Sequence, residues 1–141
     1  MRNDIVGLDI FSSDGIKSFY ISYISFSRMR AFFVLHYGET LYCVYDIILK
    51  NSGYCEDNVW FDLCNKIGDL SILISHSDCD GELTSNECKK LRKCLFVDEE
   101  KILSLSYRNE EYRKRMIDQM YEFIDIIEYC ADNNEIKLIF G

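Results

Sequence analysis

The stretch from Asn109 to Ala131 repeats apolar side chains at the spacing of an α-helix, and it constrains the fold more than any other feature. Glu110 and Lys114, and Glu111 and Arg115, stand four residues apart, an arrangement that stabilises a helix surface. A long helix with one apolar face must lie against another apolar layer. The apolar positions of this face are Tyr112, Met116, Met120, Phe123, Ile127 and Cys130.

The other segments supply strands and shorter helices. Strands are predicted over residues 5–11, 18–24 and 135–140, and the turn from Ser12 to Gly15 predicts that the first two form a hairpin. Helices are predicted from a cap at Ser25 or Ser27 to about Gly38, and over about 60–68, 87–95 and from 98. The apolar run 40–49 fits either a strand or a buried helix.

These patterns predict an α+β fold in which residues 1–141 form a single small domain. A mixed or antiparallel sheet would pack against the long helix, about 109–131, and the shorter helices. At this length the chain can bury a core without disulfides or metals.

Composition excludes several classes of function. A net charge of −8 argues against direct binding of nucleic acid, which needs a basic surface. No apolar run approaches a membrane span, and the start of the chain lacks the apolar core of a signal peptide. The seven cysteines are odd in number and form no Cys-x-x-Cys pair, so reduced thiols, mostly buried, are expected. We therefore expect a cytoplasmic protein with no membrane contact.

The segment from His76 to Glu87 carries a chemical signature. Aligned with a calcium-binding EF-hand loop, with Gly81 at the sharp turn, it offers oxygen ligands of the kind that Ca²⁺ or Mg²⁺ prefers. His76 occupies the first position, where a carboxylate is usual, and the β-branched run 72–74 is a poor entering helix. The candidate metal ligands are Asp78, Asp80, Glu82, Thr84 and Glu87.

The same segment has a purely structural interpretation. Thr84-Ser85-Asn86-Glu87 matches a capping box, in which Thr84 and Glu87 close the start of a helix, and Asp80-Gly81 is an ordinary turn. Asp78 and Asp80 also match the Asp-x-Asp of metal-dependent transferases, but no nucleotide-binding βαβ pattern accompanies them. No nucleophile, base and orienting group stand together, so we expect a protein that is not an enzyme. A metal-dependent hydrolase or transferase stays an alternative.

Three short motifs resemble a group of small uncharacterised bacterial and phage proteins. These proteins open with a strand like Gly7-Leu8-Asp9-Ile10 and carry a turn like that from His76 to Glu82. The segment from Tyr23 to Arg28 is also similar, and the resemblance covers about the first two thirds of the chain. The resemblance implies a bacterial or mobile-element origin, and it implies that the turn from His76 to Glu82 is a structural unit in these proteins. It implies no activity.

Five acids form an exposed face on the predicted long helix, opposite its apolar residues. They stand in its C-terminal half, where the helix dipole disfavours negative charge, and few bases stand four residues away to balance them. These acids can form an ordinary solvated helix surface, or they can form a binding site for a partner. The sequence predicts an interaction protein, an inhibitor or regulator, that binds a basic surface of a protein partner such as a nucleic-acid-binding enzyme. The residues are Asp118, Glu122, Asp125, Glu128 and Asp132; the oligomeric state stays open.

Overall fold

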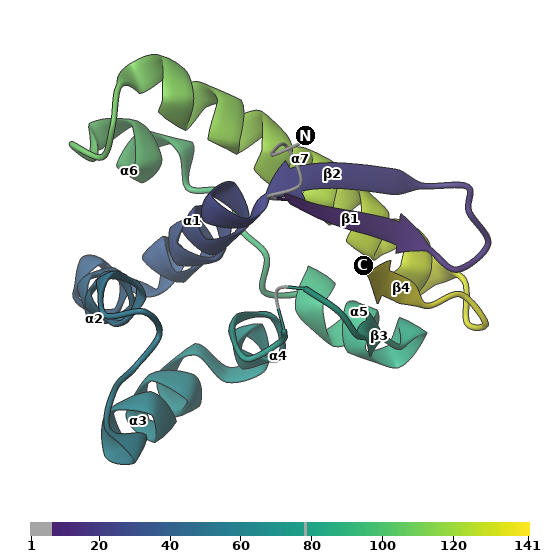
Figure 1. Cartoon of the computed structure of the whole chain (residues 1–141), viewed down its shortest axis with the longest axis horizontal. Helices are drawn as coiled ribbons and strands as arrows, with labels where there is room; N and C mark the ends of the chain where they lie inside the picture. The colour runs from purple at the N-terminus through teal and green to yellow at the C-terminus, as the bar shows by residue number, and fades with distance from the viewer. Residues whose placement is uncertain (1–6, 78) are drawn as a thin grey trace, which may run out of the picture.

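The computed structural model describes residues 7–77 and 79–141, which form an α+β domain (Figure 1). The strands are β1 (Gly7–Ser12), β2 (Ser18–Ser22), β3 (Glu82–Leu83) and β4 (Leu138–Phe140). The α-helices are α1 (Tyr23–Val34), α2 (Glu39–Lys50), α3 (Asp57–Ile67), α4 (Ser71–Ile74), α5 (Ser85–Arg92), α6 (Glu99–Ser104) and α7 (Glu110–Asp132). Short 3-10 turns, η1 (Leu35–Tyr37) and η2 (Gly68–Leu70), follow α1 and α3.

The four strands form one antiparallel sheet in the order β2-β1-β4-β3, which confirms the predicted sheet type. β1 and β2 form the predicted hairpin, and Gly15 in its turn has a φ of 76°, a backbone conformation that glycine adopts without strain. β4 is shorter than predicted. β3 was not predicted as a strand, because its two residues depend on pairing with β4 rather than on a pattern of their own.

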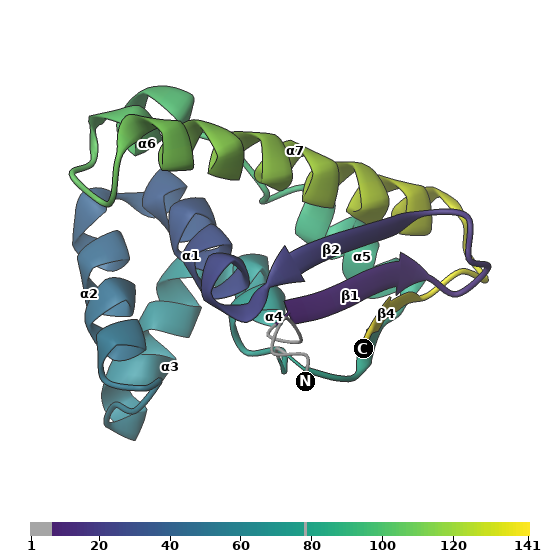
Figure 2. The ribbon, with the colours of Figure 1, turned by 45° about the horizontal axis from the view of Figure 1, so that its top comes forward.

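Helix α7 lies along one face of the sheet (Figure 2). Buried and exposed residues alternate along the strands, so Leu8 and Ile10 of β1 face the core while Asp9 faces away. The Phe19 ring of β2 lies 6.2 Å from the Phe123 ring of α7, measured between centroids. One sheet face therefore supplies the apolar layer that the long helix requires.

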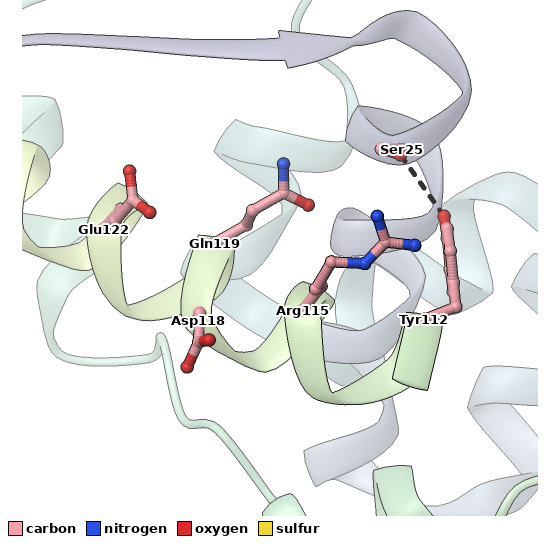
Figure 3. A pocket seen from close by; sticks show the side chains of 6 residues that line it. All are labelled: Ser25, Tyr112, Arg115, Asp118, Gln119 and Glu122. Carbon is pink, nitrogen blue, oxygen red and sulfur yellow. Dashed lines mark hydrogen bonds between the residues drawn. The ribbon is translucent and has the colours of Figure 1, made fainter. Parts of the chain in front are cut away.

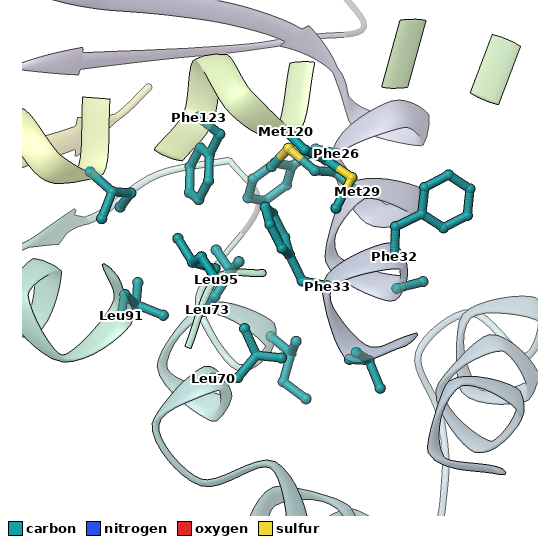
Figure 4. Close-up of a cluster of buried hydrophobic side chains, with 14 of the residues drawn as sticks. Phe26, Met29, Phe32, Phe33, Leu70, Leu73, Leu91, Leu95, Met120 and Phe123 are labelled. Carbon is teal, nitrogen blue, oxygen red and sulfur yellow. The ribbon is translucent and has the colours of Figure 1, made fainter. Parts of the chain in front are cut away.

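Helix α1 occupies the centre of the molecule, and every residue from Met29 to Val34 is buried. Phe26 and Phe33 each pack against Phe123, with ring centroids 6.3 and 6.2 Å apart. Leucines from η2 to just beyond the end of α5 complete this cluster, namely Leu70, Leu73, Leu91 and Leu95 (Figure 4). The core is thus built where α1 meets α7.

The predicted start of α1 was wrong. Ser22 caps the helix by accepting a hydrogen bond from the Ser25 backbone N–H, at 3.2 Å, so the helix begins before Ser25 and Ser27. Tyr23 and Ile24, which were assigned to the preceding strand, form its first turn. The strand and the helix are joined without a loop, and the β-branched and aromatic run hid the boundary.

Two apolar runs of ambiguous type are helical. In α2, Tyr42, Tyr45 and Ile48 are buried three residues apart, which a helix places on one face. The run 72–74, which was considered a poor helix, lies in the short helix α4, where Leu73 and Ile74 are buried. Tertiary packing overrides the preference of β-branched residues here.

Helix α7 confirms the prediction for residues 109–131. Asn109 caps it by accepting a hydrogen bond from the Tyr112 backbone N–H, at 2.7 Å. Its buried face is wider than predicted, since Arg113, Ile117 and Ile126 are also buried. The helix contacts both the sheet and α5, so its buried face must be wider than a single narrow stripe of apolar residues.

All seven cysteines are free, as expected. The expectation that most are buried was wrong: Cys88, Cys94 and Cys130 are buried, and the others are partly or fully exposed. Burial raises the pKa of the Cys94 thiol to about 11, which keeps it protonated and unreactive at neutral pH.

The first prediction concerns Ile127, which is fully buried in α7. Ile127→Ala should lower the free energy of unfolding by about 2–5 kcal/mol, because it removes buried apolar contact and leaves a cavity. Glu128→Gln, at the exposed neighbouring position, is the control and should change it by less than about 0.5 kcal/mol. Urea denaturation measures both. An Ile127→Ala loss no larger than the control would mean that the faces of α7 are assigned backwards.

Candidate functional site

All five acids of the predicted binding face are exposed on α7. Two of them pair with bases from other elements. The Lys17 Nζ, in the hairpin turn, lies 3.1 Å from the Asp125 carboxylate, and Arg92 of α5 pairs with Asp132. The expectation that few bases balance this face considered only positions four residues apart along the helix. Asp125 and Asp132 instead link the hairpin and α5 to α7.

Asp118 and Glu122 differ from these two acids. Within residues 7–77 and 79–141 neither carboxylate has an ion-pair partner. Both line a surface groove of about 300 Å³ between α7 and the start of α1. The other residues of the groove are Ser25, Tyr112, Arg115 and Gln119.

The groove has a polar lining of mixed charge (Figure 3). Glu122, Gln119 and Arg115 point to the same side of α7, whereas Asp118 points to the other side. One end is closed by Tyr112, whose hydroxyl lies 3.3 Å from the Ser25 hydroxyl of α1. The Arg115 guanidinium lies 5.9 Å from the centre of the Tyr112 ring. The arrangement offers a carboxylate to a hydrogen-bond donor and a guanidinium to an acceptor.

Sequence reasoning missed four residues of this groove. Tyr112 was assigned to the buried face, Arg115 to a pair with Glu111 and Ser25 to a helix cap, while Gln119 carried no signal. Ser25 and Tyr112 are 87 residues apart in the chain, so no local pattern predicts that they meet. Glu128, the fifth acid, is exposed on α7 outside the groove.

The segment from His76 to Glu87 contains the predicted capping box. The Thr84 backbone N–H donates to the Glu87 carboxylate at 2.9 Å, and the Glu87 N–H donates to the Thr84 hydroxyl at 3.1 Å. The Glu82 carboxylate lies 2.8 Å from the Lys137 Nζ, and this hydrogen bond raises the pKa of Lys137. Three of the five candidate metal ligands therefore have partners within the protein.

The two remaining candidate ligands are Asp80, which is exposed, and Asp78, which lies outside the described residues. Across the part of the chain that the structure describes, no group of three or more histidines, cysteines and acids is placed to hold a metal ion. Binding of Ca²⁺ or Mg²⁺ stays a prediction, and the described geometry is that of a capped turn.

His76, at the first position of the proposed loop, stabilises this turn. Its ring packs on Phe140 of β4 with centroids 4.2 Å apart, and its Nδ1 and Nε2 lie 2.7 and 3.3 Å from the carbonyl oxygens of Ser77 and Glu82. Gly81 has a φ of 99°, and a Cβ there would meet the His76 ring at 3.2 Å. Both the backbone conformation and the close approach explain glycine at this position.

Comparison of the chain with protein-family models, with curated proteins and with solved structures found no match. In the described ranges, 7–77 and 79–141, no helix combines the length and the apolar character that a membrane span needs.

The second prediction separates the capped turn from a cation site. Glu87→Ala should lower the free energy of unfolding by about 0.5–2 kcal/mol, because it removes one half of the capping box. Millimolar calcium should leave the Tm of the wild-type protein unchanged. Glu82→Gln, which breaks a surface ion pair, serves as a control of small effect. A calcium-dependent rise in Tm that Glu87→Ala abolishes would establish the cation site instead.

Proposed function

We propose that this protein binds a basic surface of a partner protein through the groove that Asp118 and Glu122 line. The observation that carries the proposal is the difference between these two acids and their neighbours. Asp125 and Asp132 are paired within the molecule, whereas Asp118 and Glu122 are exposed beside a concavity without an ion-pair partner in the described chain. The Glu122 carboxylate in the groove, and that of Asp118 on the other side of α7 at its edge, are therefore available to a ligand.

Stability does not account for these two acids. They stand beyond the first turn of α7, so the positive end of the helix dipole does not stabilise them. They pair with no base among the described residues, and the whole protein already carries a net charge of −8. A partner rich in lysine and arginine would be attracted by this field and would associate faster at low salt.

The side chains of the groove can also orient a bound partner protein. Glu122 can accept a hydrogen bond from an arginine or lysine of the partner, while Arg115 can donate to a carbonyl or carboxylate. Tyr112, half-buried beside Ser25, offers an aromatic edge of the kind that often anchors interfaces. The partner class that best fits is a protein with clustered basic side chains, as on nucleic-acid-binding enzymes, and the protein would act as a regulator or inhibitor.

The third prediction tests the groove with a fluorescently labelled arginine-rich peptide as the basic probe, measured by anisotropy at low salt. The variant is Asp118→Lys/Glu122→Lys. It should bind the peptide at least about tenfold more weakly, because it replaces attraction by repulsion at the groove. Its free energy of unfolding should change by less than about 0.5 kcal/mol, as expected for exposed positions.

The matched control is Glu100→Lys/Glu135→Lys, at exposed positions outside the groove. Each charge reversal adds two units, so both double variants raise the net charge by four, from −8 to −4. The control should retain most of the binding. Equal losses in the two variants would show that the peptide responds to net charge alone, and the groove would then not be a binding site.

A further inference from the structure

A second pocket lies on a different side of the molecule, where α1, α2, α3 and α4 meet. Its volume is about 240 Å³. The polar residues at its wall are Arg30 of α1, with His76 and Ser77 from the turn after α4. The rest of the wall is formed by Tyr45, Ile48, Leu49, Gly53, Trp60 and Ile74. Apolar and aromatic walls with a few converging polar groups are typical of small-ligand sites.

Arg30 is the residue that makes this pocket unusual. Its side chain is buried, with 6% of the residue exposed, and its Nη1 donates to the His76 carbonyl oxygen at 3.0 Å. The guanidinium carbon lies 4.7 Å from the centre of the Phe26 ring. Within residues 7–77 and 79–141 its Nε has no hydrogen-bond partner, as is also true of Arg28 and Arg113, and no carboxylate pairs with its guanidinium. One carbonyl and one aromatic ring are thus its identified partners.

The other two buried arginines have more partners. Arg28 donates to the Asp46 carboxylate at 2.8 Å and to the Tyr42 hydroxyl at 3.0 Å. Arg113 donates to the carbonyl oxygens of Tyr107, Arg108 and Leu103. A buried charge without a counter-ion is unfavourable, and an anion in the pocket would compensate it. The planar guanidinium group suits a carboxylate or a phosphate.

We propose that this pocket binds a small anion that carries one apolar, preferably aromatic, group. Arg30 binds the carboxylate or phosphate, and Ser77 supplies a hydroxyl at the same wall. Trp60, Tyr45 and Ile48 contact the apolar part. The volume limits the ligand to about the size of one substituted ring. This site is independent of the groove on α7, with which it shares no residue.

Trp60 is the only tryptophan of the chain, so its fluorescence reports on this pocket alone. The intact protein is titrated with benzoate, phenyl phosphate, inorganic phosphate and the neutral analogue benzamide. Benzoate or phenyl phosphate should change the Trp60 emission saturably, and benzamide should not. A response to phenyl phosphate but not benzoate assigns a phosphate site, and the reverse assigns a carboxylate site. No saturable response to either aromatic anion, or an equal response to benzamide, overturns the proposal; so does inorganic phosphate binding as tightly as phenyl phosphate.

Two variants and a control complete the test. Arg30→Met should weaken anion binding at least about tenfold, whereas Lys66→Met, at an exposed lysine of α3, should leave it unchanged. An unchanged affinity in Arg30→Met contradicts the proposal, and if that variant does not fold, the comparison of benzoate with benzamide in the wild-type protein still decides. The variant Asp78→Asn tests whether the Asp78 carboxylate, rather than a bound ligand, neutralises Arg30. Binding that appears only in Asp78→Asn means that this carboxylate neutralises Arg30, and the ligand site is then rejected.

Discussion

The arrangement of this domain depends on how helix α1 is buried together with two arginines. Arg28 and Arg30 lie inside the molecule with 7% and 6% of each residue exposed. A buried guanidinium requires partners, since leaving it unpaired is costly. Arg28 finds Asp46 of α2, and its guanidinium carbon lies 4.0 Å from the centre of the Tyr107 ring. Arg30 finds the His76 carbonyl. The two arginines thereby position α2 and the turn at His76 around α1.

The candidate sites follow from the same placement of α1. Its first turn brings Ser25 against Tyr112 of α7, and this contact closes one end of the groove that Glu122 lines. Five residues further along α1, Arg30 lines the second pocket, which α2, α3 and α4 complete. Residues of the buried helix α1 thus line both concave surfaces. The acids of α7 that bind other elements, Asp125 and Asp132, stabilise the layer on which the groove is built.

Sequence reasoning succeeded where the determining contacts are local. The capping box from Thr84 to Glu87 spans four residues, and the extent of α7 is marked by a cap at its start and by a long run of apolar residues at helical spacing, so both were predicted. The type of α2 was undecided because its run is apolar on most sides. The pairing of Lys17 with Asp125 joins positions 108 residues apart, and that of Arg30 with His76 joins positions 46 apart. Contacts of this kind leave no trace in local spacing, and the groove and the second pocket depend on them.

The ion pair between Arg28 and Asp46 is tested most directly by the pKa of the Asp46 carboxyl group, measured by NMR titration. Burial raises this pKa, but hydrogen bonds from Arg28 and Lys50 outweigh burial and hold it below the usual 3.8. A lowered pKa means that the pair stabilises the fold above pH 3.8 and that this stability is lost as the pH falls through the measured value. A pKa below 3.8 is the predicted result. A value above 3.8 would contradict the account, because burial would then outweigh the pairing that holds α2 against α1.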